Sequence, residues 1–249
     1  MWFATQVGID RYDGWKFEPV ENLDKQLINR FTLLQDFDDD HILTGIGKQL
    51  YLVHKRNLKA KRIVFSQEQQ IDGSILAVFQ SQGGYLLFTA KKVYRTQNDI
   101  RSLSGPFTLF DKSTSKRITK GVQTGPDEFI IGTNEGFYSF DATNNKLMML
   151  NWELPVTALF LSKDSLLYIG SDYMYMSAYD LKKKEQLNIL NKVSDDPVQH
   201  SRAAITSLFI DDENRLWVGT AFAGLYIYKI DLQNPLIIQL SNDLLCRAN

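Results

Sequence analysis

The sequence is poor in cysteine and in long apolar runs, and each shortage excludes a class of protein. Its 249 residues contain one cysteine, Cys246, so neither a disulfide framework nor a cysteine-rich zinc site is possible. No apolar run reaches the roughly 18–20 residues of a membrane-spanning helix. Residues 1–8 also lack the basic and apolar regions of a signal peptide. We therefore expect no direct insertion of this chain into a membrane.

The chain also lacks an excess of charge of either sign. It has 28 Lys and Arg against 29 Asp and Glu, so the formal net charge is −1. A protein that binds nucleic acid usually carries a strong basic surface. The densest basic segments, residues 54–62 and 182–184, follow predicted third strands and fit solvated hairpin tips better than phosphate contacts. We predict no nucleic-acid partner.

What the sequence does contain is an internal repeat. Its clearest copy, residues 205–228, has an apolar strand, an acidic turn, a second strand ending in Gly219-Thr220, and a third strand after Gly224. The apolar residue that opens the third strand recurs at intervals of 41, 43, 44, 39 and 49 residues. These marker residues are Ile9, Leu50, Val93, Phe137, Met176 and Leu225. Four-stranded propeller blades have this period, about 40–50 residues.

We therefore predict an all-β protein, a β-propeller of about six four-stranded blades in a single domain over residues 1–249. One blade cannot bury both faces of its sheet, so blades must pack against each other. The Gly-Thr pair and the following glycine are expected to form a tight turn, because glycine tolerates positive φ. Trp2 and Trp217 occupy equivalent positions and are expected to be packing residues. Residues 31–34 are expected to form a first strand rather than part of a helix.

The last copy resembles the repeat of the two-component regulator propeller family. It has an acidic turn from Asp211, then Leu-Trp-Val-Gly-Thr at 216–220 and Gly-Leu-x-x-Tyr at 224–228. Residues 2–14 and 129–141 resemble the family pattern too, whereas the other three copies lack the tryptophan. The resemblance implies the sensor domain of a hybrid two-component system on the periplasmic or extracellular side. It implies detection of oligosaccharides, with no catalysis and no cofactor.

Two departures from the family leave alternatives open. The family's propellers usually have seven blades, whereas this chain has six motifs, and the first begins without a strand ahead of Trp2. Either a six-bladed ring closes with an incomplete blade, or the chain is a fragment of a longer receptor, which we favour. The remainder of a sensor protein would then be a partner. The alternative functions are a WD40-like protein-interaction platform and, third, a glycan-active enzyme, whose paired carboxylates need not be adjacent in sequence.

No metal site is predicted. Residues 36–40 have the Asp-x-Asp-x-Asp spacing that begins a calcium loop, but His41 and Gly47 stand where that loop needs glycine and glutamate. We interpret this segment as the polar turn between a blade's first two strands. His41, His54 and His200 lie in different repeats without zinc-ligand spacing.

The candidate ligand-binding surface is the propeller face that the turns between second and third strands share with the loops leading into first strands. The turns present Gln6, Lys48, Lys91, Glu135, Tyr173 and Phe222. The long loop ahead of the best repeat, residues 194–202, adds His200 and Arg202. Amide, charged and aromatic side chains together can bind a sugar by hydrogen bonding and stacking. We therefore predict an oligosaccharide ligand at this face.

Overall fold

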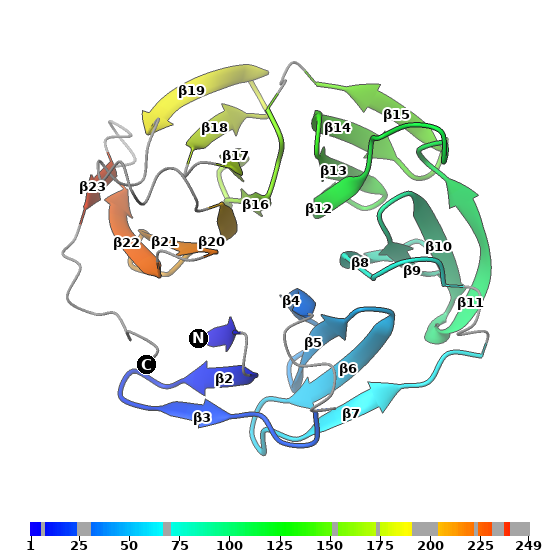
Figure 1. Ribbon diagram of the computed structural model, residues 1–249, viewed down its shortest axis with the longest axis horizontal. Helices are drawn as coiled ribbons and strands as arrows, with labels where there is room; N and C mark the ends of the chain where they lie inside the picture. Colours follow the sequence, from blue (N-terminus) through cyan, green and yellow to red (C-terminus); the bar gives the residue numbers. More distant parts are fainter. Residues whose placement is uncertain are drawn as a thin grey trace. The chain divides into compact units, whose positions relative to one another are not determined.

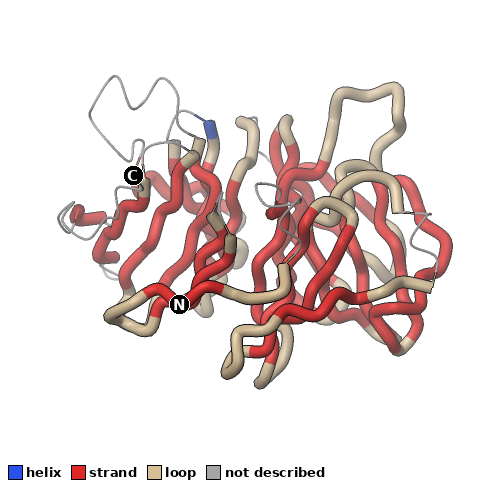
Figure 2. Tube along the Cα trace, turned by 60° about the horizontal axis from the view of Figure 1, so that its bottom comes forward, coloured by secondary structure: helices blue, strands red, loops and turns tan. Residues whose placement is uncertain are grey.

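A computed structural model of the chain describes residues 1–5, 8–23, 31–66, 71–150, 154–172, 175–190, 204–221, 224–230 and 237–239. The chain divides into two compact units, Met1–Ser115 and Lys116–Asn249, and each is described by itself. Each unit has three antiparallel sheets (Figure 1). Strands joined by loops make up most of the described trace (Figure 2). In these described residues, no helix has the length and apolar character needed to cross a membrane.

The first unit contains one three-stranded and two four-stranded sheets. The first sheet is β1 (Trp2–Ala4), β2 (Ile9–Tyr12) and β3 (Phe17–Pro19). The second is β4 (Phe31–Asp36), β5 (His41–Ile46), β6 (Gln49–His54) and β7 (Ala60–Ile63). The third is β8 (Ala77–Ser81), β9 (Gly84–Phe88), β10 (Lys92–Gln97) and β11 (Asp99–Thr108). In every sheet, strands that follow each other in the sequence are hydrogen-bonded neighbours.

The second unit contains three four-stranded sheets with the same meander order. The first of these is β12 (Ile118–Gly125), β13 (Glu128–Thr133), β14 (Gly136–Asp141) and β15 (Lys146–Met149). The next is β16 (Ala158–Leu161), β17 (Leu166–Gly170), β18 (Met176–Asp180) and β19 (Glu185–Leu190). The last is β20 (Ile205–Ile210), β21 (Arg215–Thr220), β22 (Leu225–Ile230) and β23 (Ile237–Gln239).

The predicted all-β class and the phase of the repeat are confirmed. Each of the six marker residues is the first or second residue of its sheet's third strand, or of β2 in the three-stranded sheet. Residues 31–34 lie in β4, as expected. The basic segment 182–184 lies in the connection from β18 to β19, as expected, and segment 54–62 runs from the end of β6 through the connection into β7. The first sheet has no described strand ahead of Trp2. The single domain over residues 1–249 stays a prediction.

Within each unit, consecutive four-stranded sheets are connected by one apolar residue. This residue lies just ahead of the first strand of the later sheet, or at its start. These residues are Ile75, Val156 and Ile205, and each has no exposed surface. Each donates its backbone N–H to a carbonyl at the preceding sheet's second-to-third strand turn, at 2.8–3.2 Å: Gly47, Thr133 and Ser171, respectively. We call them the joint residues. They place each incoming first strand beside the preceding turn, so the predicted sharing of one face is confirmed for these segments.

Threonine side chains complete two of the joints. The hydroxyl of Thr32 in β4 donates to the carbonyl of Ile75, and the hydroxyl of Thr119 in β12 donates to that of Val156. In both strands the pairing shifts register at the threonine, which is the signature of a β-bulge. The bulge turns the hydroxyl toward the next sheet, so both backbone polar groups of the joint residue are satisfied.

Glycine at the end of a second strand makes room for the joint residue. A Cβ added at Gly132 would lie 2.5 Å from Cγ1 of Val156, and one at Gly170 would lie 2.5 Å from Cγ2 of Ile205. Neither glycine has a positive φ. The expectation that this glycine serves a tight turn is therefore wrong. It permits the close approach of the next sheet instead.

The turn between the second and third strands is formed by two other residues. One is the threonine that follows the joint glycine, and the other is the glycine that precedes or opens the third strand. Gly136 and Gly224 have φ of 123° and 86°, which confirms the expected positive φ there. Thr133 and Thr220 donate their hydroxyls back to the carbonyls of Gly136 and Gly224, at 2.8 and 2.7 Å. In the Gly-Thr pair, the glycine therefore permits close packing of the next sheet, and the threonine closes the turn.

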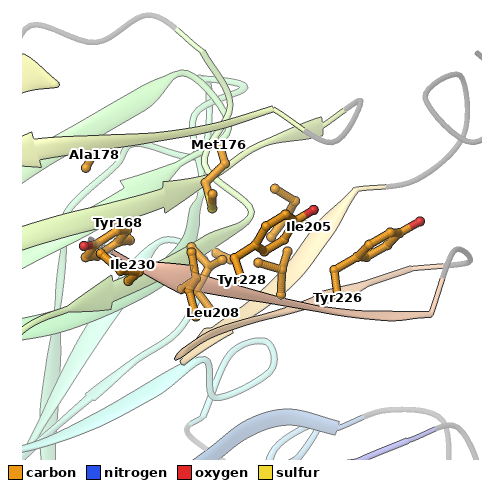
Figure 3. Packing of buried hydrophobic residues seen from close by; sticks show 11 residues of the cluster. Tyr168, Met176, Ala178, Ile205, Leu208, Tyr226, Tyr228 and Ile230 are labelled. Carbon is orange, nitrogen blue, oxygen red and sulfur yellow. The ribbon is translucent and has the colours of Figure 1, made fainter. Parts of the chain in front are cut away.

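Apolar side chains fill the space between consecutive sheets. Between the sheets β16–β19 and β20–β23, Tyr168 and Ala178 pack with Leu208, Leu216 and Tyr228 in one buried cluster. Figure 3 shows several of these side chains meeting from the two sheets. This burial supplies the main favourable free energy for holding the sheets together.

In the last sheet, the acidic turn is hydrogen-bonded to the tryptophan of the second strand. The Nε1–H of Trp217 donates to Oδ2 of Asp211 at 2.8 Å, and Nε of Arg215 donates to the same oxygen at 2.7 Å. The Arg215 guanidinium also lies 5.7 Å from the centre of the indole ring. Trp217 is partly buried, and the contacts described for it are this hydrogen bond and the Arg215 guanidinium. Its packing role stays a prediction. Trp2, as expected, packs against a buried apolar cluster of the first unit.

Substituting the joint glycine tests this description. Gly132→Ala should lower the free energy of unfolding by roughly 1–3 kcal/mol, because its Cβ would press on Val156, whose backbone is pinned. Urea denaturation measures the change. Gly105→Ala is the control: its Cβ would meet nothing within 4 Å, so its effect should stay within about 0.5 kcal/mol. Equal stability of the two variants would contradict the joint.

Acid titration tests the Asp211 turn. Burial opposes ionisation of Asp211, but hydrogen bonds from Trp217 and Arg215 outweigh it, and the pKa of Asp211 is lowered. Asp211→Asn should cost about 1–2 kcal/mol at neutral pH. Because the folded-state pKa is the lower one, this difference from wild type should hold above about pH 4 and shrink as the pH falls further. The exposed neighbour substitution Asp212→Asn should show neither effect. A difference that does not depend on pH would refute the role of the charge.

Candidate functional site

The structure describes three of the eight predicted site residues: Lys48, Lys91 and Glu135. All three lie in turns between second and third strands, as predicted. The other five lie outside the described residues: Gln6, Tyr173, His200, Arg202 and Phe222. Lys48 and Lys91 belong to the first unit and Glu135 to the second. The binding role of all eight stays a prediction.

Glu135 lies beside a lysine and a tyrosine of its own sheet. Its carboxylate is 3.9 Å from the ammonium of Lys116, which lies 5.3 Å from the ring centre of Tyr138. At that distance, with the Glu135 side chain 42% exposed, the ion pair contributes little to stability. The Glu135 carboxylate therefore stays accessible to solvent.

Lys48 and Lys91 belong to a group of charged residues in the first unit, the basic turn cluster. It comes from four segments: the β5–β6 turn, the segment leading into β8, the β9–β10 connection with the first residue of β10, and the loop after β11. Its members are Lys48, Asp72, Lys91, Lys92 and Lys112. The cluster lies where the turn of one sheet meets the incoming segment of the next, because Ile75 donates its N–H to Gly47.

Asp72 and Lys92 form the paired centre of the cluster. The Lys92 ammonium lies 3.0 Å from Oδ2 of Asp72. The Asp72 N–H donates to the hydroxyl of the fully buried Tyr94 at 2.7 Å, which fixes the backbone there. The hydrogen bond and charge of Lys92 lower the pKa of Asp72, and the charges of Lys112 and Lys48 act in the same direction. Asp72 is therefore ionised at neutral pH with three lysines around it.

Lys91 acts as a brace. Its ammonium donates to the backbone carbonyls of Asp111, Lys112 and Thr114, at 3.2, 3.2 and 2.7 Å. Its own carbonyl accepts N–H groups from the same loop. The Lys91 ammonium, which the sequence predicts to bind a ligand, thus donates its hydrogen bonds within the protein. The same bonds hold the backbone of Lys112 in place. Lys112, Lys92 and Asp72 were not among the predicted site residues.

Two lysines of the cluster keep their charges available. Lys48 and Lys112 are exposed. Within the described part of the chain, neither ammonium group has a hydrogen-bond or ion-pair partner. With Asp72 balancing Lys92, the cluster presents an excess of positive charge to solvent.

The described residues hold no group of three or more His, Cys, Asp or Glu placed to bind a metal ion. In the turn at residues 36–40, Oδ1 of Asp38 accepts the N–H groups of Asp40 and His41, at 2.9 and 2.7 Å. The Nδ1 of His41 lies 2.9 Å from the same oxygen. Asp38 is therefore occupied in a polar turn, as interpreted from the sequence. Among described carboxylates with a resolved shift, Asp10 alone has a raised pKa, which burial causes.

A lone lysine lies in the first strand β12. Lys120 pairs with Gly132 in the β12–β13 register. In the other four-stranded sheets, the first-strand residue at the equivalent position has an uncharged side chain. These residues are Leu33, Ala77, Ala158 and Ser207. Lys120 is partly buried, and this burial lowers the pKa of its ammonium. No carboxylate of the described residues pairs with it.

Comparison with known families finds one match by sequence. Residues 201–222 match the sequence model of a family described as two component regulator propeller. The described part of this segment contains Asp211 and Trp217, the hydrogen-bonded pair of the last sheet. No curated protein matches the chain.

Solved structures match over nearly the whole chain. One is the extracellular domain of BT4673 from B. thetaiotaomicron, described both as a hybrid two component system and as a one component system. It covers 98% of this chain with a TM-score of 0.67 at 17% identity. The extracellular domain of BT3049 from the same organism, described as a hybrid two component system, covers 97% with a TM-score of 0.64 at 17% identity.

A third match is the WD40 beta propeller domain of Doa1, which covers 79% of this chain at 12% identity with a TM-score of 0.59. The chain is a β-propeller. It carries a two-component regulator propeller repeat at residues 201–222, in agreement with the sequence resemblance. The propeller covers 32% of the BT4673 domain, 33% of the BT3049 domain and 63% of the Doa1 domain. It therefore spans about a third of the length of the extracellular domains.

Removing the lone charge in β12 should stabilise the propeller. Lys120→Met keeps the side chain's length and should raise the free energy of unfolding by about 1 kcal/mol at neutral pH. Because the pKa of Lys120 is lower in the folded chain than in the unfolded one, the free energy of unfolding of the wild type should rise with pH. Its deficit relative to the variant should therefore shrink as the pH approaches about 10.4. Urea denaturation between pH 7 and 9.5 measures both effects. The exposed Lys163→Met is the control and should show neither. Loss of stability in Lys120→Met would mean that the ammonium has a stabilising partner.

Proposed function

We propose that this propeller is a non-catalytic ligand-sensing module that binds an oligosaccharide on its second-to-third strand turns. It acts on the periplasmic or extracellular side as part of a sensor. The observation that carries the proposal is the family match at residues 201–222. The fold likeness to extracellular domains of two-component systems supports it.

The turns suit ligand recognition because the joints hold them in place. A joint residue fixes each incoming segment to the preceding turn by a backbone hydrogen bond, as Ile75 does at Gly47. Exposed side chains at the turns, such as Lys48, are then presented from a rigid scaffold. Binding residues are commonly carried on loops of this kind.

The carboxylates that the structure describes favour a binding role over glycoside hydrolysis. Hydrolysis of a glycosidic bond uses two carboxyl groups, one of which has a raised pKa. Asp10 has a raised pKa, but it lies on β2 opposite Phe3 and Pro19, with no carboxyl group as cross-strand partner. We therefore assign sensing rather than catalysis.

The proposed partner is the remainder of a sensor protein. The extracellular domains that match are about three times as long as this chain. A bound ligand can change signalling only if it binds two states of the receptor with different affinity. The rest of the receptor would supply the second state. No nucleic-acid partner is proposed.

One surface favours a second candidate, a protein-interaction platform. Trp15, in the turn between β2 and β3, is 95% exposed. Beside it on β3, Phe17 is 47% exposed and stacks on Tyr12, with ring centres 4.8 Å apart. Exposed aromatic side chains of this kind are enriched at protein–protein contacts. If this surface binds a partner, Trp15→Ala should abolish that binding and leave sugar binding unchanged.

Thermal melting against a panel of oligosaccharides tests the proposed function. A ligand that binds only the folded state, at 100 times its Kd, adds about 2.7 kcal/mol of stability and raises the Tm by several degrees. We expect a selective rise that depends on ligand concentration. The corresponding monosaccharides serve as controls and should give smaller shifts. No shift with any sugar, from a chain that melts cooperatively, would contradict the sensor and favour the interaction platform.

A further inference from the structure

We infer that the basic turn cluster binds the acidic group, a carboxylate or a sulfate, of an oligosaccharide. This inference rests on the proposed function and narrows its ligand to acidic sugars. It concerns the first unit alone, where the whole cluster lies.

The charge balance of the cluster comes first. Lys48 follows Gly47, which is hydrogen-bonded to Ile75 in the segment of Asp72, and Lys112 lies in the loop that the Lys91 ammonium holds. Their charges, with that of Lys92, lower the pKa of Asp72. Asp72 pairs with Lys92 at 3.0 Å, and the ammonium groups of Lys48 and Lys112 are left without a partner among the described residues. An anion that binds these ammonium groups would gain charge-assisted hydrogen bonds, which are about twice as strong as neutral ones.

The backbone segments that carry Lys48 and Lys112 are fixed before any ligand arrives. The turn that carries Lys48 is tied to the segment of Asp72 by the bond from Ile75 N–H to the Gly47 carbonyl. The loop that carries Lys112 is tied down by the three bonds from the Lys91 ammonium. Ordering the backbone on binding therefore costs little, and preorganisation of this kind favours affinity.

The carboxylate of Asp72 points to a sugar rather than a simple anion. A site for free phosphate or sulfate would gain nothing from a carboxylate at its centre, which repels the ligand. A sugar acid carries hydroxyl groups beside its acidic group, and hydroxyl groups donate hydrogen bonds. The side chain of Asp72 is 57% exposed and can accept such a bond, while the lysines bind the acidic group.

The test is calorimetric titration of the full chain with acidic oligosaccharides and matched neutral ones. The probes are tetragalacturonic acid, its methyl ester, and tetrasaccharides of chondroitin sulfate and unsulfated chondroitin. The methyl ester keeps the sugar and its linkages but removes the charge. The chondroitin pair separates a sulfate from the carboxylate that both members carry. Binding to an acidic probe should weaken as salt is added, because the cluster is exposed.

Charge removal at the two free lysines identifies the site. Lys48→Gln/Lys112→Gln should weaken the binding of the acidic probe by about tenfold or more, since each charge-assisted hydrogen bond is worth about a factor of ten. The matched control is Lys59→Gln/Lys61→Gln. It removes two exposed lysines at the β6–β7 connection and in β7, whereas Lys48 precedes β6 at its other end. The control should bind the probe like wild type.

The outcomes separate this inference from the proposed function. Binding of an acidic probe that the Lys48/Lys112 variant loses and the control keeps supports both. Equal binding of charged and neutral probes, unaffected by the substitutions, overturns the inference and leaves the sensor intact. If none of these probes binds, the inference is overturned, and the wider melting panel decides whether the sensor proposal survives. All variants alter exposed side chains, and a cooperative melt at the wild-type temperature confirms that each one folds.

Discussion

The contact on which the rest of the structure depends is that between a joint residue and a glycine of the preceding sheet. Val156 shows all its parts: its side chain fills the space above Gly132, its N–H binds Thr133 and its carbonyl binds Thr119. Within each unit, the sheets that a joint residue connects are thus positioned by backbone hydrogen bonds as well as by apolar packing. Apolar packing alone is non-directional and would allow neighbouring sheets to slide. The joints remove that freedom at the turn end of the sheets that they connect.

Most of the fold could be predicted because it repeats. The marker residues keep phase over the whole chain, and alternating apolar residues identified strands such as β20 and β21. The function of Gly132 could not be predicted in the same way. Its constraint comes from Val156, 24 residues away, whereas turn rules consider only neighbours in sequence. The hydrogen bond from Trp217 to Asp211 could not be predicted either, because the apolar ring of a tryptophan favours a prediction of packing over one of hydrogen bonding.

The candidate site was predictable only in part. Lys48 and Lys91 were placed correctly because a turn's position follows from the period of the repeat. Their different roles were not predictable: Lys91 holds a loop through three carbonyls, and Lys48 has no hydrogen-bond or ion-pair partner among the described residues. Asp72 and Lys112 join the cluster from segments about 40 residues apart, and nothing in the local sequence marks that convergence. Lys92 joins the cluster from the first residue of β10, a position that the repeat assigns to a strand rather than to a turn.

The joints also bear on how such a protein changes during evolution. They use backbone groups and a few small or apolar residues, and each involves only two consecutive sheets, as in other repeat proteins. The exposed turn residues take no part in them. Duplicated repeats can therefore exchange their turn side chains one at a time without disturbing the scaffold. This agrees with a fold that the chain shares with the B. thetaiotaomicron domains at 17% identity. The side chains that the turns present can thus vary independently of the architecture that carries them.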